Sequence, residues 1–330
     1  MNESRLSNGL FLTSFLTVVL CVVATASSCT SGNGPGPETA DASTVDTDST
    51  PDSAAEDVPA ADVPAVDTGS ASPPAEGARS SANIFFLGHS LLGWDAPTML
   101  AQFAEANGLT YSFDAAVGIG ANLSWQWQHP DRAQGENPRT ALSAQPYDLL
   151  VLTEAVPIAN QVQGADSVQN ALNFMQLAYE QNPDVQVYLY ETWEHRENDA
   201  WRDSIREVRT FYDQIVDGVN ARFDGRDMLI IPGGQAMGAL VDSIRAGDVP
   251  GVSDEGALFV DDIHLTPLGW YFIACVHYAT IYQRSPVGVP VETIDRFENP
   301  FTAPPAAAAA VMQQIAWDVV SGEARSGVTR

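Results

Sequence analysis

The hydrophobic and polar positions divide the chain at about residue 80. Beyond it, short apolar runs alternate with longer segments whose apolar residues recur at helical spacing. Short runs rich in β-branched and aromatic residues are typical of buried strands, and a 3.6-residue period is typical of helices that cover a sheet. Five strands are predicted, at residues 83–87, 111–117, 148–152, 185–190 and 228–231. Six helices are predicted, at residues 96–106, 168–181, 200–221, 235–246, 266–283 and 304–320.

The order of these segments predicts the fold. Strands that alternate with helices form a mainly parallel sheet with helices on both faces, because each crossover places a helix against the sheet. We therefore predict that residues 81–330 form one α/β domain, a three-layer α/β/α sandwich around a mainly parallel five-stranded sheet. Glycine and polar residues follow several strands, at the sheet edge where ligands bind in open α/β folds.

The N-terminal part has a different pattern. Residues 9–24 form an apolar segment that is short for a membrane span and is followed by small polar residues, as in a secretory signal. The Ala-Ser-Ser-Cys sequence that ends at Cys29 is similar to the lipobox of bacterial lipoproteins, in which the cysteine is acylated. We therefore predict a signal peptide over residues 1–29 with Cys29 as the lipidation site. Cleavage after Ala26, or a signal anchor that stays in the membrane, are the alternatives.

Residues 30–80 consist almost wholly of small, polar and acidic residues. Such a composition buries too little apolar surface to offset the conformational entropy of the chain, so we predict a disordered acidic tether. A tether directly after Cys29 suits a protein that is exported and anchored by lipid to the bacterial envelope, on its periplasmic or cell-surface side. Secretion without an anchor is the alternative. No particular oligomeric state is indicated.

Composition excludes several classes of function. The net charge is −27, and residues 81–330 hold 31 acidic residues against 13 arginines. This excess of negative charge repels phosphate backbones, so no nucleic-acid partner is expected. The chain has no lysine, which excludes Schiff-base chemistry and a lysine-bearing phosphate loop. Three cysteines, Cys21, Cys29 and Cys275, give neither a disulfide framework nor a zinc site. We therefore expect no cofactor and no metal.

Two motifs supply groups for nucleophilic catalysis. Gly88-His89-Ser90 follows the first predicted strand and precedes a helix, where the amide of the serine can stabilise a developing oxyanion. Asp261 precedes His264 by three residues, which lets the carboxylate orient the imidazole while the other ring nitrogen faces a hydroxyl. Each motif also has a purely structural explanation, the serine as a helix N-cap and the Asp-His pair as part of a polar loop.

Together these motifs resemble the sequence blocks of SGNH/GDSL hydrolases. The Gly-His-Ser segment that ends at Ser90, Gly120 after the second strand, and Asp261-x-x-His264 before a long helix follow the family's order, over residues 83–285. The resemblance implies a flavodoxin-like sandwich and hydrolysis of carboxylic esters, often acyl groups on lipids or sugars. It also implies that Ser90 is the nucleophile, His264 the general base and then acid, and Asp261 its orienting partner. The amides of Ser90 and Gly120 would donate to the oxyanion.

One block departs from that family's pattern. The family places a Gly-x-Asn-Asp segment after the third strand, and the Asn side chain completes the oxyanion hole, whereas this chain reads Leu152-Thr153-Glu154-Ala155. We expect Thr153 to donate through its hydroxyl, because an ionised Glu154 cannot donate. Asn122 is the alternative donor. The absence of one oxyanion donor typically costs about 10²–10³ in rate.

Polar and aromatic residues near these motifs are predicted to line a substrate site: Asn122, Trp125, Glu154 and Trp193. Aromatic rings in such a site stack on sugars or hold acyl chains, although packing is their commoner role. A metal site at Glu191, Glu194 and His195 is a minor alternative, because a cluster on one loop lacks supporting ligands. The predicted function is hydrolysis of acyl esters of small molecules, glycans or lipids. The alternative is a carbohydrate-binding lipoprotein that keeps the fold without activity.

Overall fold

The computed structural model describes residues 77–196 and 200–329. The predicted signal peptide, Cys29 and residues 30–76 of the predicted tether lie outside these ranges. Residues 77–80, also assigned to the tether, contact the domain, because Arg79 donates its N–H to Tyr282 O at 3.1 Å and its guanidinium to Ile281 O at 2.9 Å. In the part of the chain that is described, no helix has both the length and the apolarity of a transmembrane span.

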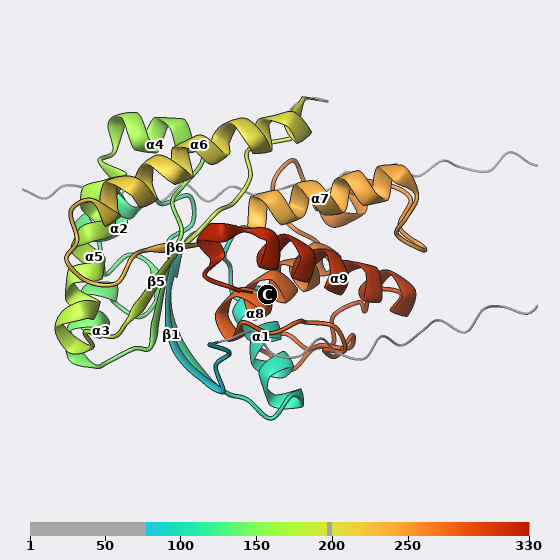
Figure 1. The fold of residues 1–330 in the computed structure, drawn as a ribbon, viewed down its shortest axis with the longest axis horizontal. Helices are drawn as coiled ribbons and strands as arrows, with labels where there is room; N and C mark the ends of the chain where they lie inside the picture. Colours follow the sequence, from blue (N-terminus) through green and yellow to red (C-terminus); the bar gives the residue numbers. More distant parts are fainter. Residues whose placement is uncertain (1–76, 197–199, 330) are drawn as a thin grey trace, which may run out of the picture. The chain divides into compact units, whose positions relative to one another are not determined.

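A six-stranded sheet lies between two layers of helices (Figure 1). The strands are β1 (Ser81–Gly88), β2 (Thr110–Val117), β3 (Gln134–Gly135), β4 (Leu149–Leu152), β5 (Gln186–Tyr190) and β6 (Leu229–Ile231). Their order is β3-β2-β1-β4-β5-β6, and every neighbouring pair is parallel except β2 with β3. Without β3 this is the order of flavodoxin-like sheets. The predicted five-stranded parallel sheet is confirmed, with one short antiparallel strand added at its edge.

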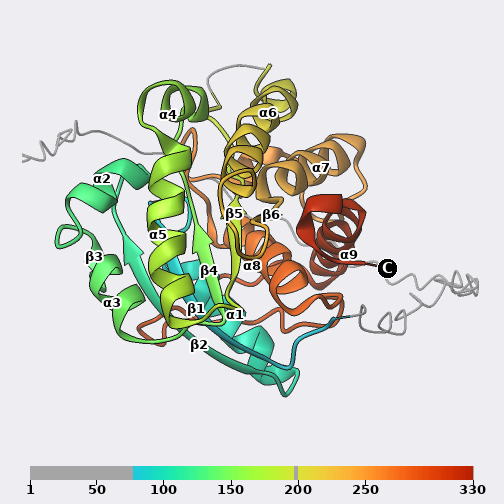
Figure 2. The same ribbon diagram turned by 60° about the vertical axis from the view of Figure 1, so that its left-hand side comes forward.

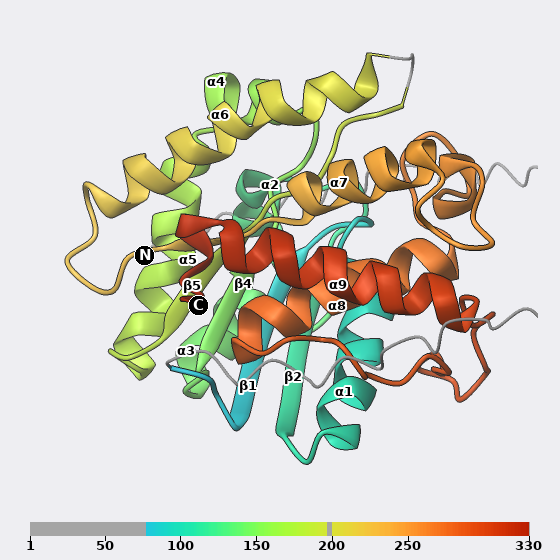
Figure 3. The same cartoon turned by 45° about the vertical axis from the view of Figure 1, so that its right-hand side comes forward.

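One face of the sheet is covered by α1 (Asp95–Ala106), α7 (Gly233–Ala246), α8 (Pro267–Tyr282) and α9 (Ala306–Gly322). Figure 3 shows this face, with α9 in front of α8. The α8 helix is buried along almost its whole length, because it packs against the sheet, α1 and α9. An apolar surface on every side of this helix is therefore required.

The other face is covered by five helices (Figure 2): α2 (Leu123–Gln128), α3 (Pro138–Ala144), α4 (Ile158–Gly164), α5 (Ser167–Gln181) and α6 (Trp201–Asn220). Two 3₁₀ helices, Glu255–Leu258 and Ala324–Ser326, complete the described elements. Alternate residues of β1 enter opposite cores, since Ile84 and Phe86 pack with α1 and α8, whereas Phe85 and Leu87 pack with α5. Burial on both faces explains the continuous apolar runs of the central strands.

Candidate active site

Ser90 lies in the turn between β1 and α1, at the carboxyl edge of the sheet. The buried ring of His89 holds this turn: its Nδ1 accepts the N–H of Leu91 at 3.4 Å, so Nε2 carries the hydrogen and donates to Glu154 O at 3.0 Å. Its carbonyl accepts the N–H of Gly93 at 3.0 Å. Burial lowers the pKa of His89 to about 4. His89 is therefore neutral and structural, and it positions the half-buried Ser90 beside it.

Ser90, His264 and Asp261 form a continuous chain of hydrogen bonds. His264 Nε2 lies 2.9 Å from Ser90 Oγ, and His264 Nδ1 lies 2.7 Å from Asp261 Oδ2. Asp261 Oδ1 also accepts the N–H groups of His264 at 2.6 Å and of Ile263 at 2.9 Å. The hydrogen bonds from the His264 N–H, the His264 ring and the Ile263 N–H hold the pKa of Asp261 well below its usual range. The ionised carboxylate keeps the hydrogen on Nδ1, which leaves Nε2 free to accept the hydroxyl hydrogen of Ser90.

A closed loop presents Asp261 and His264. The N–H of Val260 donates to His264 O at 2.8 Å, and the flanking residues Phe259 and Leu265 form an antiparallel bridge. The α8 helix starts directly afterwards, with Thr266 as its N-cap and proline at its first position. The sequence after His264 therefore ends the loop at a fixed point.

The two predicted backbone donors of the oxyanion hole are the N–H groups of Ser90 and Gly120. They follow β1 and β2 at the same edge of the sheet. Gly88 pairs with Val117, and the N–H of Gly118 donates to Gly88 O at 2.9 Å, so the loop that carries Gly120 starts beside the end of β1. Gly120 has a φ of +67°, a conformation that favours glycine. Within the ranges that the structure describes, neither the Ser90 N–H nor the Gly120 N–H has a hydrogen-bond acceptor. Both groups can therefore donate to a ligand.

Thr153 is not the third donor. Its side chain has no exposed surface, and a Cβ added at Gly88 would lie only 2.8 Å from its Oγ1. The hydroxyl thus lies beneath the end of β1, and the prediction that it donates to an oxyanion is wrong. Leu87 pairs with Leu152, and His89 Nε2 donates to Glu154 O, so the segment that follows β4 lies beside the turn that carries Ser90. The sequence did not reveal this register.

Glu154 and Trp193 were both predicted to contact substrate, and both are completely buried. Glu154 Oε1 accepts the N–H of Leu123 at 3.1 Å and that of Ala155 at 2.9 Å, and burial raises its pKa. It fastens the first turn of α2 to the loop after β4. Trp193 donates its indole N–H to Ile263 O at 2.9 Å. The two predictions are wrong, because both side chains are used inside the protein.

Asn122 and Trp125 lie in the half-buried segment that follows Gly120. Asn122 caps α2, since its Oδ1 accepts the Trp125 N–H at 2.7 Å, and its amide donates to Gln161 Oε1 at 2.8 Å. The Trp125 ring lies 5.4 Å from the ring of His129. A structural role is therefore visible for each, and their contact with a substrate stays a prediction.

The residues of the minor metal-site alternative have separate partners. Glu191 contacts Arg209, Glu194 accepts the N–H of Ile158, and His195 pairs with Asp262. In the described ranges, no group of three or more His, Cys, Asp or Glu side chains is arranged to hold a metal ion. The His195–Asp262 pair was not foreseen, because its two members are 67 residues apart in the chain.

The fold and the site define a three-layer α/β protein with a Ser-His-Asp hydrogen-bond chain at the carboxyl edge of its sheet. No protein-family model matches the chain, and no curated protein matches its sequence. Among solved structures, it is similar to a DUF4886 family protein from Bacteroides uniformis, with a TM-score of 0.52 and 18% identity over 76% of this chain and 97% of that one.

Other solved structures are similar to a lesser degree. A carbohydrate esterase of family 3 from Talaromyces cellulolyticus has a TM-score of 0.42 and 15% identity over 61% of this chain and 97% of that one. A GDSL-like lipase from Bacteroides thetaiotaomicron has a TM-score of 0.37 and 15% identity over 61% of this chain and 88% of that one. At such identities the likeness is one of fold. The sandwich that the resemblance to SGNH/GDSL hydrolases implies is confirmed by the architecture of the described residues.

Proposed function

We propose that the protein is a serine hydrolase that cleaves carboxylic esters. The observation that carries this proposal is the hydrogen-bond chain from Ser90 Oγ through His264 to Asp261, with distances of 2.9 and 2.7 Å. Ser90 and His264 are 174 residues apart, so only the fold brings them together. A hydroxyl bonded to one nitrogen of an imidazole whose other nitrogen donates to an ionised carboxylate is the arrangement of an activated nucleophile.

In the proposed reaction, Ser90 Oγ attacks the ester carbonyl carbon while its proton passes to His264 Nε2. The Asp261 carboxylate stabilises the imidazolium that forms, and the free N–H groups of Ser90 and Gly120 donate to the oxyanion. His264 then gives the proton to the departing alcohol, which leaves an acyl group on Ser90. A water molecule, deprotonated by His264, attacks this acyl-enzyme, and collapse of the second intermediate releases the carboxylic acid and restores the serine.

The oxyanion site lacks the side-chain donor that the resemblance leads one to expect. Ala155, in the segment that follows β4, has no polar side chain, and its N–H already donates to Glu154 Oε1 at 2.9 Å. The oxyanion site then has two backbone donors and no side-chain donor. We therefore expect turnover about 10²–10³-fold below that of a site with all three donors.

The exposure of the site bears on the substrate. The side chains of His264 and Asp261 have exposed fractions of 41% and 48%, so the reacting groups lie at an open surface. Such a site can reach an ester on a large carrier, and we propose an acyl group on a glycan or lipid. The excess of 18 negative charges over residues 81–330 repels polyanions and favours a neutral substrate.

A second candidate function rests on the incomplete oxyanion site. If Ala155 marks a site that has lost its catalytic role, the protein is a carbohydrate-binding protein that keeps the fold. In that case a folded chain would bind glycans but would not react with electrophiles that trap activated serines.

The deciding experiment treats the full chain with a fluorophosphonate probe and with p-nitrophenyl acetate. Labelling and hydrolysis are expected for the unmodified protein, with no labelling of Ser90→Ala and strongly reduced labelling of His264→Ala. Ser112→Ala is the matched control, because this exposed serine lies on β2 and its hydroxyl donates to Asn83 Oδ1 at 2.8 Å. A folded protein that is neither labelled nor active would support the second candidate function, a carbohydrate-binding protein without hydrolase activity.

We also propose export with lipid attachment at Cys29. Metabolic labelling with a palmitate analogue would detect the acyl chain, and Cys29→Ser should abolish the label. A mature N-terminus directly after Ala26 would instead indicate a secreted form without an anchor.

A further inference from the structure

A second His-Asp pair lies directly beside the first. His195 Nδ1 is 2.7 Å from Asp262 Oδ2, and Asp262 adjoins Asp261 in the chain. Two consecutive aspartates thus each bind one histidine, Asp261 to His264 and Asp262 to His195. Both members of the second pair are partly open to solvent, with exposed fractions of 43% and 54%.

The segment that carries His195 contacts the catalytic loop at three points. The indole N–H of Trp193 donates to Ile263 O at 2.9 Å, the N–H of Arg196 donates to Asp262 O at 2.8 Å, and His195 binds the Asp262 side chain. All three contacts fall on the two residues that lie between Asp261 and His264. The segment that carries His195 therefore holds the middle of the turn between Asp261 and His264 in place.

The same segment is itself anchored to the helical layers. Glu194 Oε1 accepts the N–H of Ile158 at the start of α4 at 2.8 Å, and Trp201 of α6 donates to Glu194 O at 2.7 Å. The guanidinium of Arg196 lies 4.3 Å from the ring centre of Phe259 and 5.6 Å from that of Trp201. These contacts connect the rigid α/β scaffold to the catalytic loop.

We propose that His195 is a positioning residue for the Ser90–His264–Asp261 site. It holds the Asp262 side chain and thereby fixes the turn that presents Asp261 and His264 to Ser90. This inference rests on the proposed hydrolase function. An exposed ion pair adds little to stability, whereas displacement of a catalytic group by about 1 Å can lower turnover about 100-fold. Loss of His195 should therefore affect catalysis far more than folding.

The test compares four variants of the full chain: His195→Ala, Asp262→Ala, the double variant, and His195→Asn. Asparagine can place an N–H donor near the position of His195 Nδ1, so it is the rescue variant. Asp242→Ala is the matched control, because Asp242 has a similar exposed fraction of 51% and pairs with Arg202 at 2.8 Å between α6 and α7.

We expect both single alanine variants to lower kcat for p-nitrophenyl acetate and the rate of fluorophosphonate labelling about 10- to 100-fold, with KM unchanged. The double variant should be no worse than either single variant, because the two side chains act as one unit. His195→Asn should recover most of the rate. Asp242→Ala should keep full rate and should change Tm by as much as the other variants do.

Three results would overturn the proposal. Unchanged rates would show a surface pair without consequence. A raised KM with an unchanged labelling rate would show that His195 touches substrate, and losses that multiply in the double variant would show independent roles. The downfield proton resonance of His264 Nδ1–H, assigned from its absence in His264→Ala, gives a readout that needs no turnover. If the unmodified protein is inert but this resonance shifts in His195→Ala, the positioning role stands and the hydrolase function fails.

Discussion

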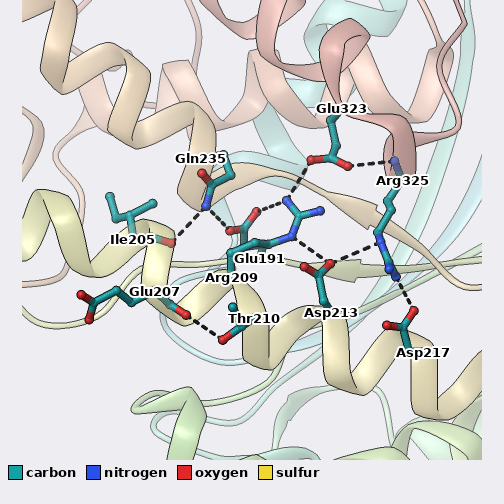
Figure 4. Close-up of polar contacts among 10 residues, drawn as sticks. All are labelled: Glu191, Ile205, Glu207, Arg209, Thr210, Asp213, Asp217, Gln235, Glu323 and Arg325. Atoms are coloured by element: carbon teal, nitrogen blue, oxygen red, sulfur yellow. Dashed lines mark hydrogen bonds and ion pairs between the residues drawn. The ribbon is translucent and has the colours of Figure 1, made fainter.

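Two clusters of charged residues in the domain differ in their exposure and in the direction in which the pKa of their central carboxyl group is shifted. The first is the exposed Asp261–His264 pair beside Ser90. The second surrounds Glu191, which follows β5 directly and has no exposed surface (Figure 4). Glu191 Oε1 accepts from Gln235 at 2.7 Å, and its Oε2 lies 3.4 Å from the guanidinium of Arg209.

The buried cluster extends to the C-terminal part of the domain. Arg209 of α6 donates to Glu323 at 2.9 Å and to Asp213 at 3.1 Å, and Glu323 accepts the N–H of Arg325 at 2.8 Å. Figure 4 shows these groups bridging α6, the start of α7 and the segment after α9. The cluster therefore joins three elements, whereas the exposed pair orients one imidazole.

The pKa shifts of the two carboxyl groups are opposite in sign. Burial raises the pKa of Glu191 to about 7, despite the nearby Arg209 and the hydrogen bond from Gln235. Three hydrogen bonds lower that of Asp261, which is not buried. Desolvation penalises a charge that is removed from water, whereas donors aimed at the carboxylate favour it. Substitutions in the first cluster should therefore change chemistry, and those in the second should change stability.

The largest effect is expected at the exposed Asp261–His264 pair, where a substitution should reduce activity and leave stability nearly unchanged. Asp261→Asn should lower kcat by about 10⁴-fold, because the amide no longer keeps His264 in the tautomer that accepts the serine hydrogen. The midpoint of thermal unfolding should change little, since exposed pairs contribute little to folding. Assays with p-nitrophenyl acetate and calorimetry measure the two quantities, with Asp242→Asn as the control. Full activity in Asp261→Asn would remove the distinction between the clusters.

The next effect is a loss of stability without a loss of activity, and it is expected in the cluster around Glu191. Arg209→Leu removes the cation beside Glu191 and Glu323 and should lower the free energy of unfolding by about 3–5 kcal/mol at pH 8. The rate of fluorophosphonate labelling of the folded fraction should not change. Urea unfolding measures the loss, and Arg206→Leu, an exposed substitution on the same helix, is the control. A stable Arg209→Leu protein with impaired labelling would show that the cluster serves the site.

The long elements of the fold follow from the sequence, because the central strands are buried on both faces and α8 is buried on all sides. These environments demand apolar runs such as residues 84–87 and 271–276, which are visible without a structure. The short α2, α3 and α4 helices of six or seven residues were missed. Two of them start at asparagine caps, Asn122 and Asn137, and they are too short to display a helical period.

The site was predictable where its geometry is local and was missed where it depends on register. Asp261 and His264 meet because they lie three positions apart in one turn, and Ser90 lies just after a strand that the pattern identifies. The burial of Thr153 and Trp193 depends on how β1, β4 and β5 align, and this alignment is set by long crossovers.

A smaller effect tests whether the pKa of Glu191 is raised or lowered in the folded protein. Its folded pKa of about 7 exceeds the ordinary 4.5, so folding favours the protonated carboxyl. The stabilisation from this group is complete below pH 4.5 and is lost as the pH rises towards 7, because the unfolded chain ionises first. Glu191→Gln removes this dependence, and its stability relative to the unmodified protein should rise by up to about 2–3 kcal/mol between pH 4 and pH 8. Urea unfolding across this range checks it, with exposed Glu207→Gln as control, and a decrease would show that the ion pair with Arg209 outweighs desolvation.

The smallest effect concerns a buried group that is polar but uncharged and lies next to the site. Thr153 Oγ1 has no hydrogen-bond partner among the described residues, and its side chain is inaccessible. Thr153→Val should therefore leave kcat unchanged and raise the free energy of unfolding by up to about 1 kcal/mol, since a buried hydroxyl without a partner is costly. Thr153→Ser, which keeps the hydroxyl, is the control. A fall in kcat of about 10²–10³-fold in Thr153→Val alone would mean that the hydroxyl turns towards the oxyanion during the reaction. Thr153 would then take part in the reaction although it is buried, and burial alone would not separate structural residues from reacting ones.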